Sequence, residues 1–172
     1  MSDGFLDDET YALVQRSVPI ATIDVLCIFE DRNDSKRLLL IERDDGHGNP
    51  GLLNLVGGRI RLGESLEQAA MRHLHETIGE RVYAAPRDWG RPEWVAVYPL
   101  GDSGPGPFDP RQQSISPSYV LLCQGEPEVV EGGEATGLAW FDPDPAGLPP
   151  AERFGFGQGD VVRQMLETTG RT

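Results

Sequence analysis

The stretch that decides the fold is GGRIRLGESLEQAAMRHLHETIGE, residues 57–80. Ser65 and Gln68 have the spacing of a capping box, so the sequence predicts a helix over about 66–78. Apolar residues recur at helical spacing and would form its buried stripe: Leu66, Ala69, Ala70, Leu74 and Ile78. Gly79 is the residue type that commonly ends such a helix.

The polar side of this helix carries side chains that suit a metal ion. His73, Glu76 and Glu80 are spaced i, i+3 and i+7, so they can line one stripe. Carboxylate oxygens bind hard divalent cations, and such a cation can bridge to phosphate oxygens and neutralise charge on a leaving group. These residues are therefore candidate metal ligands. The alternative is a polar face that is only solvated.

The residues before the helix support the same site. Glu64, at the junction of loop and helix, is placed to pair with Arg72 and so to fix the loop on the helix. Arg72 shares a face with Glu76, four residues later. Gly57 and Gly58 lack side chains, so the backbone can approach a metal or a phosphate, and the carbonyl of Gly58 is a candidate ligand. The alternative is an ordinary turn before a surface helix.

The composition limits the classes of function. The chain has 172 residues, which suits a single domain over residues 1–172, and its formal net charge is −13. This charge argues against a nucleic-acid surface, but a few local arginines can still hold the phosphates of a small nucleotide. No apolar run approaches the roughly 20 residues of a membrane helix. The N-terminus has no apolar signal core, so we expect a cytoplasmic protein without a membrane partner.

The rest of the chain is mostly strand-like. The expected strands cover residues 20–29, 38–43, 52–58, 93–100 and 118–125, with a short one around Trp140–Phe141. Further helices are expected within 5–16 and over 159–170. This order predicts an α/β sandwich with a mixed sheet between helices. Cys27 and Cys123 lie in apolar runs and are expected to be buried free thiols.

Six residues of the opening stretch match a known motif in register: Gly58, Glu64, Arg72, Leu74, Glu76 and Gly79. The stretch resembles the Nudix box, G-x5-E-x7-R-E-U-x-E-E-x-G-U, where U is bulky and apolar. The resemblance implies a Nudix-type α/β/α sandwich and a hydrolase of nucleoside diphosphate derivatives that holds Mg²⁺ or Mn²⁺ on the box glutamates. The chain departs from the motif at His73 and Thr77, which replace glutamates, and at Glu80, which replaces an apolar residue.

These departures change what the site can hold. Two lost carboxylates lower the negative charge, so metal affinity should fall and a cluster of several ions is not expected. Glu76 is the strongest remaining ligand candidate. A neutral His73 would add a nitrogen ligand and favour Mn²⁺, Zn²⁺ or another transition metal over Mg²⁺. Glu80 could restore part of the charge from one turn further along.

The chain up to about residue 90 also resembles the N-terminal two-thirds of GDP-mannose mannosyl hydrolases, which likewise have fewer box glutamates. That similarity implies a nucleotide sugar as the substrate and places Asp24, Arg43 and Arg59 among the residues that contact it. The histidine that serves these relatives as general base has no counterpart, since Ser118 stands near its place. Whether the pyrophosphate or the bond to the sugar is cut stays open.

A loop carboxylate can supply the missing base. The stretch EVVEGGEATGLAWF, residues 128–141, brings Glu131 and Glu134 just ahead of the expected strand at Trp140, and either could reach a water molecule. The alternative is a solvated acidic loop. His47, in a glycine-rich loop, is near enough to the expected mouth of the site to touch a substrate.

Two functions of different classes fit these observations, beside an unrelated structural or interaction protein. The first is metal-dependent hydrolysis of a nucleoside diphosphate derivative, in which arginines offset the phosphate charge. The second is a Nudix module that binds nucleotides without turnover, which the missing glutamates and the missing histidine favour. The partner is a small nucleotide in both. Relatives are often dimers, so the resemblance is compatible with a homodimer, and the oligomeric state stays open.

Overall fold

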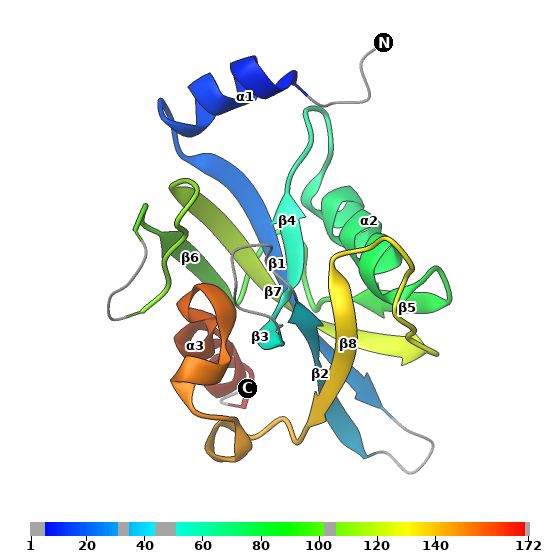
Figure 1. The fold of residues 1–172 in the computed structure, drawn as a ribbon. Coiled ribbons are helices and arrows are strands. Elements are labelled where there is room, and N and C mark those ends of the chain that lie inside the picture. The colour runs from blue at the N-terminus through cyan, green and yellow to red at the C-terminus, as the bar shows by residue number, and fades with distance from the viewer. Residues whose placement is uncertain (1–5, 31–34, 44–50, 102–105, 171–172) are drawn as a thin grey trace.

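The computed structural model describes residues 6–30, 35–43, 51–101 and 106–170. A mixed sheet of eight strands lies between α2 on one face and α3 on the other (Figure 1), which confirms the predicted α/β fold. The elements in chain order are α1 (Asp8–Gln15), β1 (Ile20–Glu30), β2 (Lys36–Arg43), β3 (Leu52–Asn54), β4 (Val56–Arg59), α2 (Leu66–Ile78), β5 (Val82–Ala85), β6 (Trp94–Tyr98), β7 (Ser114–Gly125), β8 (Ala135–Phe141) and α3 (Gln158–Gly170).

Strand β1 organises the sheet because it pairs with three other strands. One edge pairs antiparallel with β2 along its second half and with β4 along its first half, and the other edge pairs parallel with β7. Strand β8 adds to β2, whereas β5 and β6 add to β7. Since β4 follows β2 along the same edge of β1, the glycines of β4 lie directly beside Asp24.

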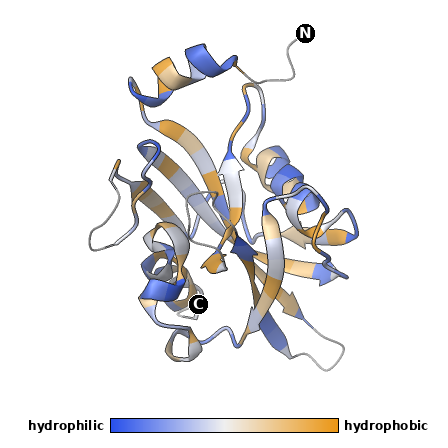
Figure 2. Ribbon diagram, viewed as in Figure 1, coloured by the Kyte–Doolittle hydropathy of each residue, from blue (hydrophilic) through white to orange (hydrophobic). Residues whose placement is uncertain are grey.

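The side chains of β1 alternate between two hydrophobic cores. Ile23 and Cys27 face the core under α2, whereas Leu26 and Ile28 face the core under α3. Cys27 and Cys123 are buried and free, as predicted. Figure 2 shows hydrophobic segments along the strands and both hydrophobic and hydrophilic residues on the helices, and the apolar residues of α2 and α3 lie in the two cores on either face of the sheet.

Helix α2 forms as the sequence predicts. The hydroxyl of Ser65 accepts a hydrogen bond from the backbone N–H of Gln68 at 3.1 Å, and the Gln68 side chain accepts one from the N–H of Ser65 at 2.8 Å. These two hydrogen bonds complete the capping box. Gly79 ends the helix with a φ of 95°, a conformation that residues with a side chain rarely adopt.

Some strand boundaries differ from the prediction. Residues 52–58 form two strands, β3 and β4, and β5 was not predicted. Strand β7 begins at Ser114 rather than at residue 118. This serine- and proline-containing run becomes a strand because β1 and β6 pair with it on both sides, so its neighbours override its weak strand propensity.

Helix α1 has no buried residue, and two of its side chains form hydrogen bonds with Gln112. The hydroxyl of Tyr11 donates to the side-chain oxygen of Gln112 at 2.7 Å, and the Gln15 amide donates to the same oxygen at 3.0 Å. Asp7 caps the helix by accepting from the N–H of Thr10 at 2.9 Å. Among the described residues, none of the helices is both long and apolar enough to cross a membrane.

We predict that Ser65→Ala lowers the free energy of unfolding by about 1 kcal/mol, because the N–H of Gln68 loses its acceptor at the start of α2. Urea denaturation at neutral pH measures this change. Ser65→Thr keeps a hydroxyl and is the matched control, with a smaller loss expected. An alanine variant as stable as the wild type would show that the cap does not support the helix.

Candidate active site

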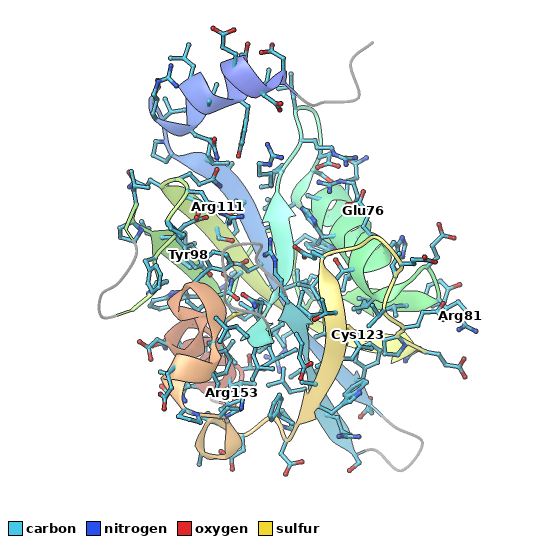
Figure 3. All side chains as sticks on the ribbon, in the orientation of Figure 1. Glu76, Arg81, Tyr98, Arg111, Cys123 and Arg153 are labelled. Atoms are coloured by element: carbon cyan, nitrogen blue, oxygen red, sulfur yellow. The ribbon has the colours of Figure 1, made fainter. Side chains whose placement is uncertain are left out.

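A pocket of about 420 Å³ opens where β1, β4 and α2 meet the turn before β7. Its lining comes from helices, strands and loops: Tyr11, Gln15, Thr22, Asp24, Arg43, Leu55, Gly57, Gly58, Arg59, His73, Tyr98, Asp109, Arg111, Gln112, Ser114, Glu134, Phe156 and Gln158. Figure 3 shows Glu76 on α2 and Arg111 on the opposite side of β4. The pocket therefore joins parts of the chain that lie far apart in sequence.

The two glycines of β4 let the walls of the pocket close on each other. Gly57 pairs with Asp24, and a Cβ at Gly57 would lie 3.0 Å from Oδ1 of that aspartate. Gly58 has a φ of 153°, and a Cβ there would lie 2.6 Å from the ring of His73. Any larger residue would push β1 or α2 away, so close approach explains both glycines.

Arg72 joins the loop before α2 to the helix, as predicted. Its Nε donates to Oε1 of Glu64 at 2.6 Å, and its Nη2 donates to Oε2 at 2.8 Å and to the carbonyl of Arg59 at 3.0 Å. The backbone N–H of Arg61 donates to the same carboxylate at 2.8 Å. The side-chain hydrogen bond from Arg72 lowers the pKa of Glu64 from 4.5 to about 2. Glu64 is therefore a positioning residue.

Glu76 lies at the edge of the site and is half exposed. Its Oε2 pairs with Nη1 of Arg72 at 3.2 Å, and its Oε1 pairs with Nη2 of Arg61 at 3.5 Å. It faces a second hollow of about 490 Å³, which His73 and Glu134 share with the main pocket. No three His, Cys, Asp or Glu side chains in the described part of the chain lie close enough to hold a metal by themselves.

Glu134 stands beside the position where the helix lacks a glutamate. Thr77 is 2% exposed, and its hydroxyl donates to Oε1 of Glu134 at 3.5 Å. The other oxygen of Glu134 pairs with Nη1 of Arg43 at 3.3 Å. Burial raises the pKa of Glu134, and the charge of Arg43 opposes that rise. The backbone N–H of Val130 donates to the carbonyl of Thr77 at 3.4 Å, which lays the loop across the end of α2.

His73 packs on β4 in its neutral form. Its Nε2 lies 3.0 Å from the carbonyl oxygen of Arg59, which can only accept, so Nε2 must carry the ring proton. Burial lowers the pKa of His73, which keeps the imidazole neutral. Nδ1 then keeps its lone pair, and a lone pair of this kind is what a transition metal binds.

Asp24 is fixed at the bottom of the pocket by a buried chain of hydrogen bonds. The hydroxyl of Tyr98 donates to Oδ2 of Asp24 at 2.8 Å, and the Gln158 amide donates to that hydroxyl at 3.3 Å. The N–H of Leu55 donates to the side-chain oxygen of Gln158 at 2.9 Å. Burial raises the pKa of both Asp24 and Tyr98.

Three arginines line the pocket from separate elements: Arg43 from β2, Arg59 from β4 and Arg111 from the turn before β7. Aromatic rings support them. The guanidinium of Arg59 lies 4.1 Å from the ring centre of Tyr11, and that of Arg43 lies 5.6 Å from the ring centre of Phe156. Because guanidinium groups hold phosphate oxygens bidentately, the pocket suits a phosphorylated ligand.

Other sequence-predicted residues lie away from this pocket. Glu80 is exposed and does not line the main pocket, but it lines another hollow together with Glu76 and Glu128. Glu131 is exposed in the loop before β8. Ser118 is fully buried in β7, where its hydroxyl donates to the carbonyl of Ser116 at 3.2 Å. His47 lies outside the described residues.

The sequence interpretation missed several residues that line the pocket: Tyr11, Tyr98, Asp109, Arg111, Gln112, Phe156 and Gln158. The polar run FDPRQQ, residues 108–113, was the available signal, since it places an aspartate and an arginine two residues apart in a loop. Phe156 and Gln158 gave no such signal, because their place in the pocket depends on how the chain packs after β8.

Comparison with known proteins identifies the fold family. The model of the NUDIX domain matches residues 20–165. The chain belongs to this family. Its fold is also similar to a structure from Jonesia denitrificans described as a possible asymmetric diadenosine tetraphosphate hydrolase, with 21% identity, a TM-score of 0.76, and coverage of 90% of this chain and 97% of that one.

Two further proteins are similar to this chain. The chain is 28% identical over 111 residues to a Bacillus subtilis protein named "Putative 8-oxo-dGTP diphosphatase". The aligned region covers 64% of this chain and 61% of that protein, so the chain spans less than two thirds of its length. The NUDIX domain of Shewanella oneidensis NrtR, solved with ADP ribose, has 21% identity and a TM-score of 0.52 and covers 96% of this chain and 99% of that one. The narrower resemblance to GDP-mannose mannosyl hydrolases is not confirmed by these relatives.

We predict that Glu64→Gln destabilises the protein at neutral pH and that the difference in unfolding free energy shrinks as the pH falls from 4.5 towards about 2. The folded-state pKa is depressed, so the stabilisation is present above the unfolded value and is lost as protonation breaks the pair with Arg72. Denaturant titrations across that range measure it. Glu67→Gln, an acid in the first turn of α2, is the control. A difference independent of pH would contradict the ion pair.

Proposed function

We propose that this chain is a metal-dependent hydrolase of nucleoside diphosphate derivatives and that it works in the arginine-lined pocket. One observation carries the proposal. Glu134, from the loop before β8, lies against Thr77 and shares a hollow with Glu76. A second carboxylate therefore stands at the metal end of the site although the helix has lost two of its glutamates.

The donor groups fit one divalent ion held together with substrate. Mg²⁺ commonly binds through one or two carboxylates, water and substrate phosphates rather than in an all-protein cage. Glu76 and Glu134 line one hollow and offer that set. Nδ1 of His73, which lines the same hollow, would join them once an ion bound with substrate draws the three groups together, and this favours Mn²⁺ over Mg²⁺. When bound, the ion would neutralise phosphate charge and stabilise the leaving oxygen.

Side chains of the pocket supply the remaining chemistry. Arg43 and Arg59 offset the charge of the diphosphate, and Asp24 orients the group attached to it from the bottom of the pocket. One oxygen of Glu134 would hold the ion, and the other, beside Arg43, accepts a proton from the attacking water, because a raised pKa brings this carboxylate closer to the pH at which the enzyme works. The water oxygen then bonds to the reacting centre, and the leaving oxygen departs with its electron pair.

We propose a broader substrate class than the sequence predicted. The names of the relatives include an 8-oxo-dGTP diphosphatase, a diadenosine tetraphosphate hydrolase and an ADP-ribose complex, and none is a nucleotide sugar hydrolase acting on GDP-mannose. What these ligands share is a chain of phosphates on a nucleoside. We therefore propose a nucleoside di- or polyphosphate derivative as the substrate and keep nucleotide sugars as one arm of the test.

The test incubates the protein with 8-oxo-dGTP, diadenosine tetraphosphate, ADP-ribose and GDP-mannose, each with Mg²⁺ or Mn²⁺, and separates the products by chromatography. Turnover that is lost in Glu76→Gln supports the hydrolase. Saturable nucleotide binding without product under any metal would instead support a binding module. The pairing of both Glu76 oxygens with arginines is the observation that favours that second function.

We predict that Glu134→Gln lowers kcat by at least about 100-fold, the usual size of a general-base effect, because the amide cannot accept the proton. Steady-state kinetics with the best substrate measures it. Glu128→Gln is the matched control in the same loop: Glu128 pairs with Arg81 at 3.3 Å on the surface and should leave kcat unchanged. Equal loss in both variants would point to damage to the loop instead.

A carboxylate swap tests whether Glu134 stands in for the missing helix glutamate. We predict that Thr77→Glu, added to Glu134→Gln, recovers at least about tenfold of the lost activity, because the new carboxylate replaces a charge at a neighbouring position. Kinetics of the double variant at several Mn²⁺ concentrations measures both activity and metal affinity. A double variant no better than Glu134→Gln would show that the two positions are not interchangeable.

A further inference from the structure

The turn before β7 fixes one edge of an arginine in the pocket. Nε and Nη2 of Arg111 donate to the two carboxylate oxygens of Asp109, both at 2.9 Å, and its backbone N–H donates to the same group at 2.9 Å. Asp109 is 5% exposed, and its own N–H donates to the carbonyl of Pro99 at 3.0 Å. The guanidinium is therefore anchored to the end of β6.

The ring of Phe156 supports the flat face of the same arginine. Its centre lies 4.8 Å from the guanidinium of Arg111 and 5.6 Å from that of Arg43. Phe156 has a φ of 55°, which is uncommon for a residue with a side chain, and its carbonyl accepts from the N–H of Phe108 at 2.9 Å. Backbone strain of this kind often accompanies a functional position. One ring thus holds two cations in one wall of the pocket.

The geometry leaves donors for a ligand. The pair with Asp109 uses Nε and Nη2 of Arg111, so within the described residues this pair leaves the N–H groups of Nη1 for a ligand of the pocket that Arg111 lines. Arg43 pairs with Glu134, whereas Arg111 lines the pocket next to Gln112, which accepts a hydrogen bond from Tyr11 of α1. Cations spread along one wall suit an anion whose charge is spread along a chain.

We infer that Arg111 is a specificity-determining residue that binds a phosphate beyond the first two of the substrate. The pocket then favours nucleotides with three or more phosphates over those with two. The inference rests on the proposed function, because it concerns the same pocket. A purely structural Arg111 would shape the turn through Asp109 and would not distinguish one chain length from another.

Calorimetry on the full chain, without divalent metal, tests the inference with inorganic pyrophosphate and tripolyphosphate and with methylene-bridged analogues of ADP and ATP. The wild type should bind each longer chain at least about tenfold more tightly, the size of one charge-assisted contact. Arg111→Gln should remove that preference and leave pyrophosphate affinity nearly unchanged. Arg37→Gln removes an arginine that lies 5.1 Å from the Trp140 ring outside the pocket, and it should keep the wild-type preference.

If Arg111→Gln prefers the longer phosphate chain as strongly as the wild type does, the inference is overturned. A wild type that binds both chain lengths with equal affinity overturns it too. A preference seen only with the inorganic anions overturns the assignment to nucleotides. Arg111→Met, which keeps packing on Phe156, replaces the glutamine variant if that one does not fold, and the same outcomes decide. A chain that shows the preference but hydrolyses no substrate overturns the proposed reaction alone, so the two failures are distinguishable.

Discussion

The site depends on the pairing of Arg72 with Glu64. This one guanidinium holds the Glu64 carboxylate, the carbonyl of Arg59 and one oxygen of Glu76, so it joins the loop after β4 to the helix that carries Glu76, the proposed metal ligand. Its side chain is 15% exposed, which lowers the competition from water and strengthens each contact. If the pair broke, Gly58 and His73 would lose the packing that forms one wall of the pocket.

A carboxylate from another part of the chain lies where the Nudix box of this protein lacks a glutamate. The helix has lost a carboxylate at Thr77, but the loop before β8 crosses the end of α2 and brings Glu134 to that hydroxyl. Arg43 then balances the charge of Glu134 at 3.3 Å. Under the proposed function, the neutral imidazole of His73 would offer a nitrogen donor in place of the second missing glutamate, and the general base would come from the loop before β8.

Contacts between residues close together in the sequence could be predicted, whereas contacts between residues far apart in the chain could not. The capping box at Ser65 and the pairing of Glu64 with Arg72 follow from positions within one turn-and-helix unit, and the structure confirms both. The contact of Arg111 with Phe156 joins residues far apart in the chain, so it depends on the order of the strands. Strand β7 starts early for the same reason, because its backbone partners lie on β1 and β6.

Diffraction from crystals soaked with Mn²⁺ and a slowly hydrolysed nucleotide analogue tests the central claim most directly. The account predicts an anomalous peak within coordination distance of the carboxylates of Glu76 and Glu134, with Glu76 released from Arg61. A peak elsewhere, or none while Glu76 stays paired with Arg61 and Arg72, would contradict it.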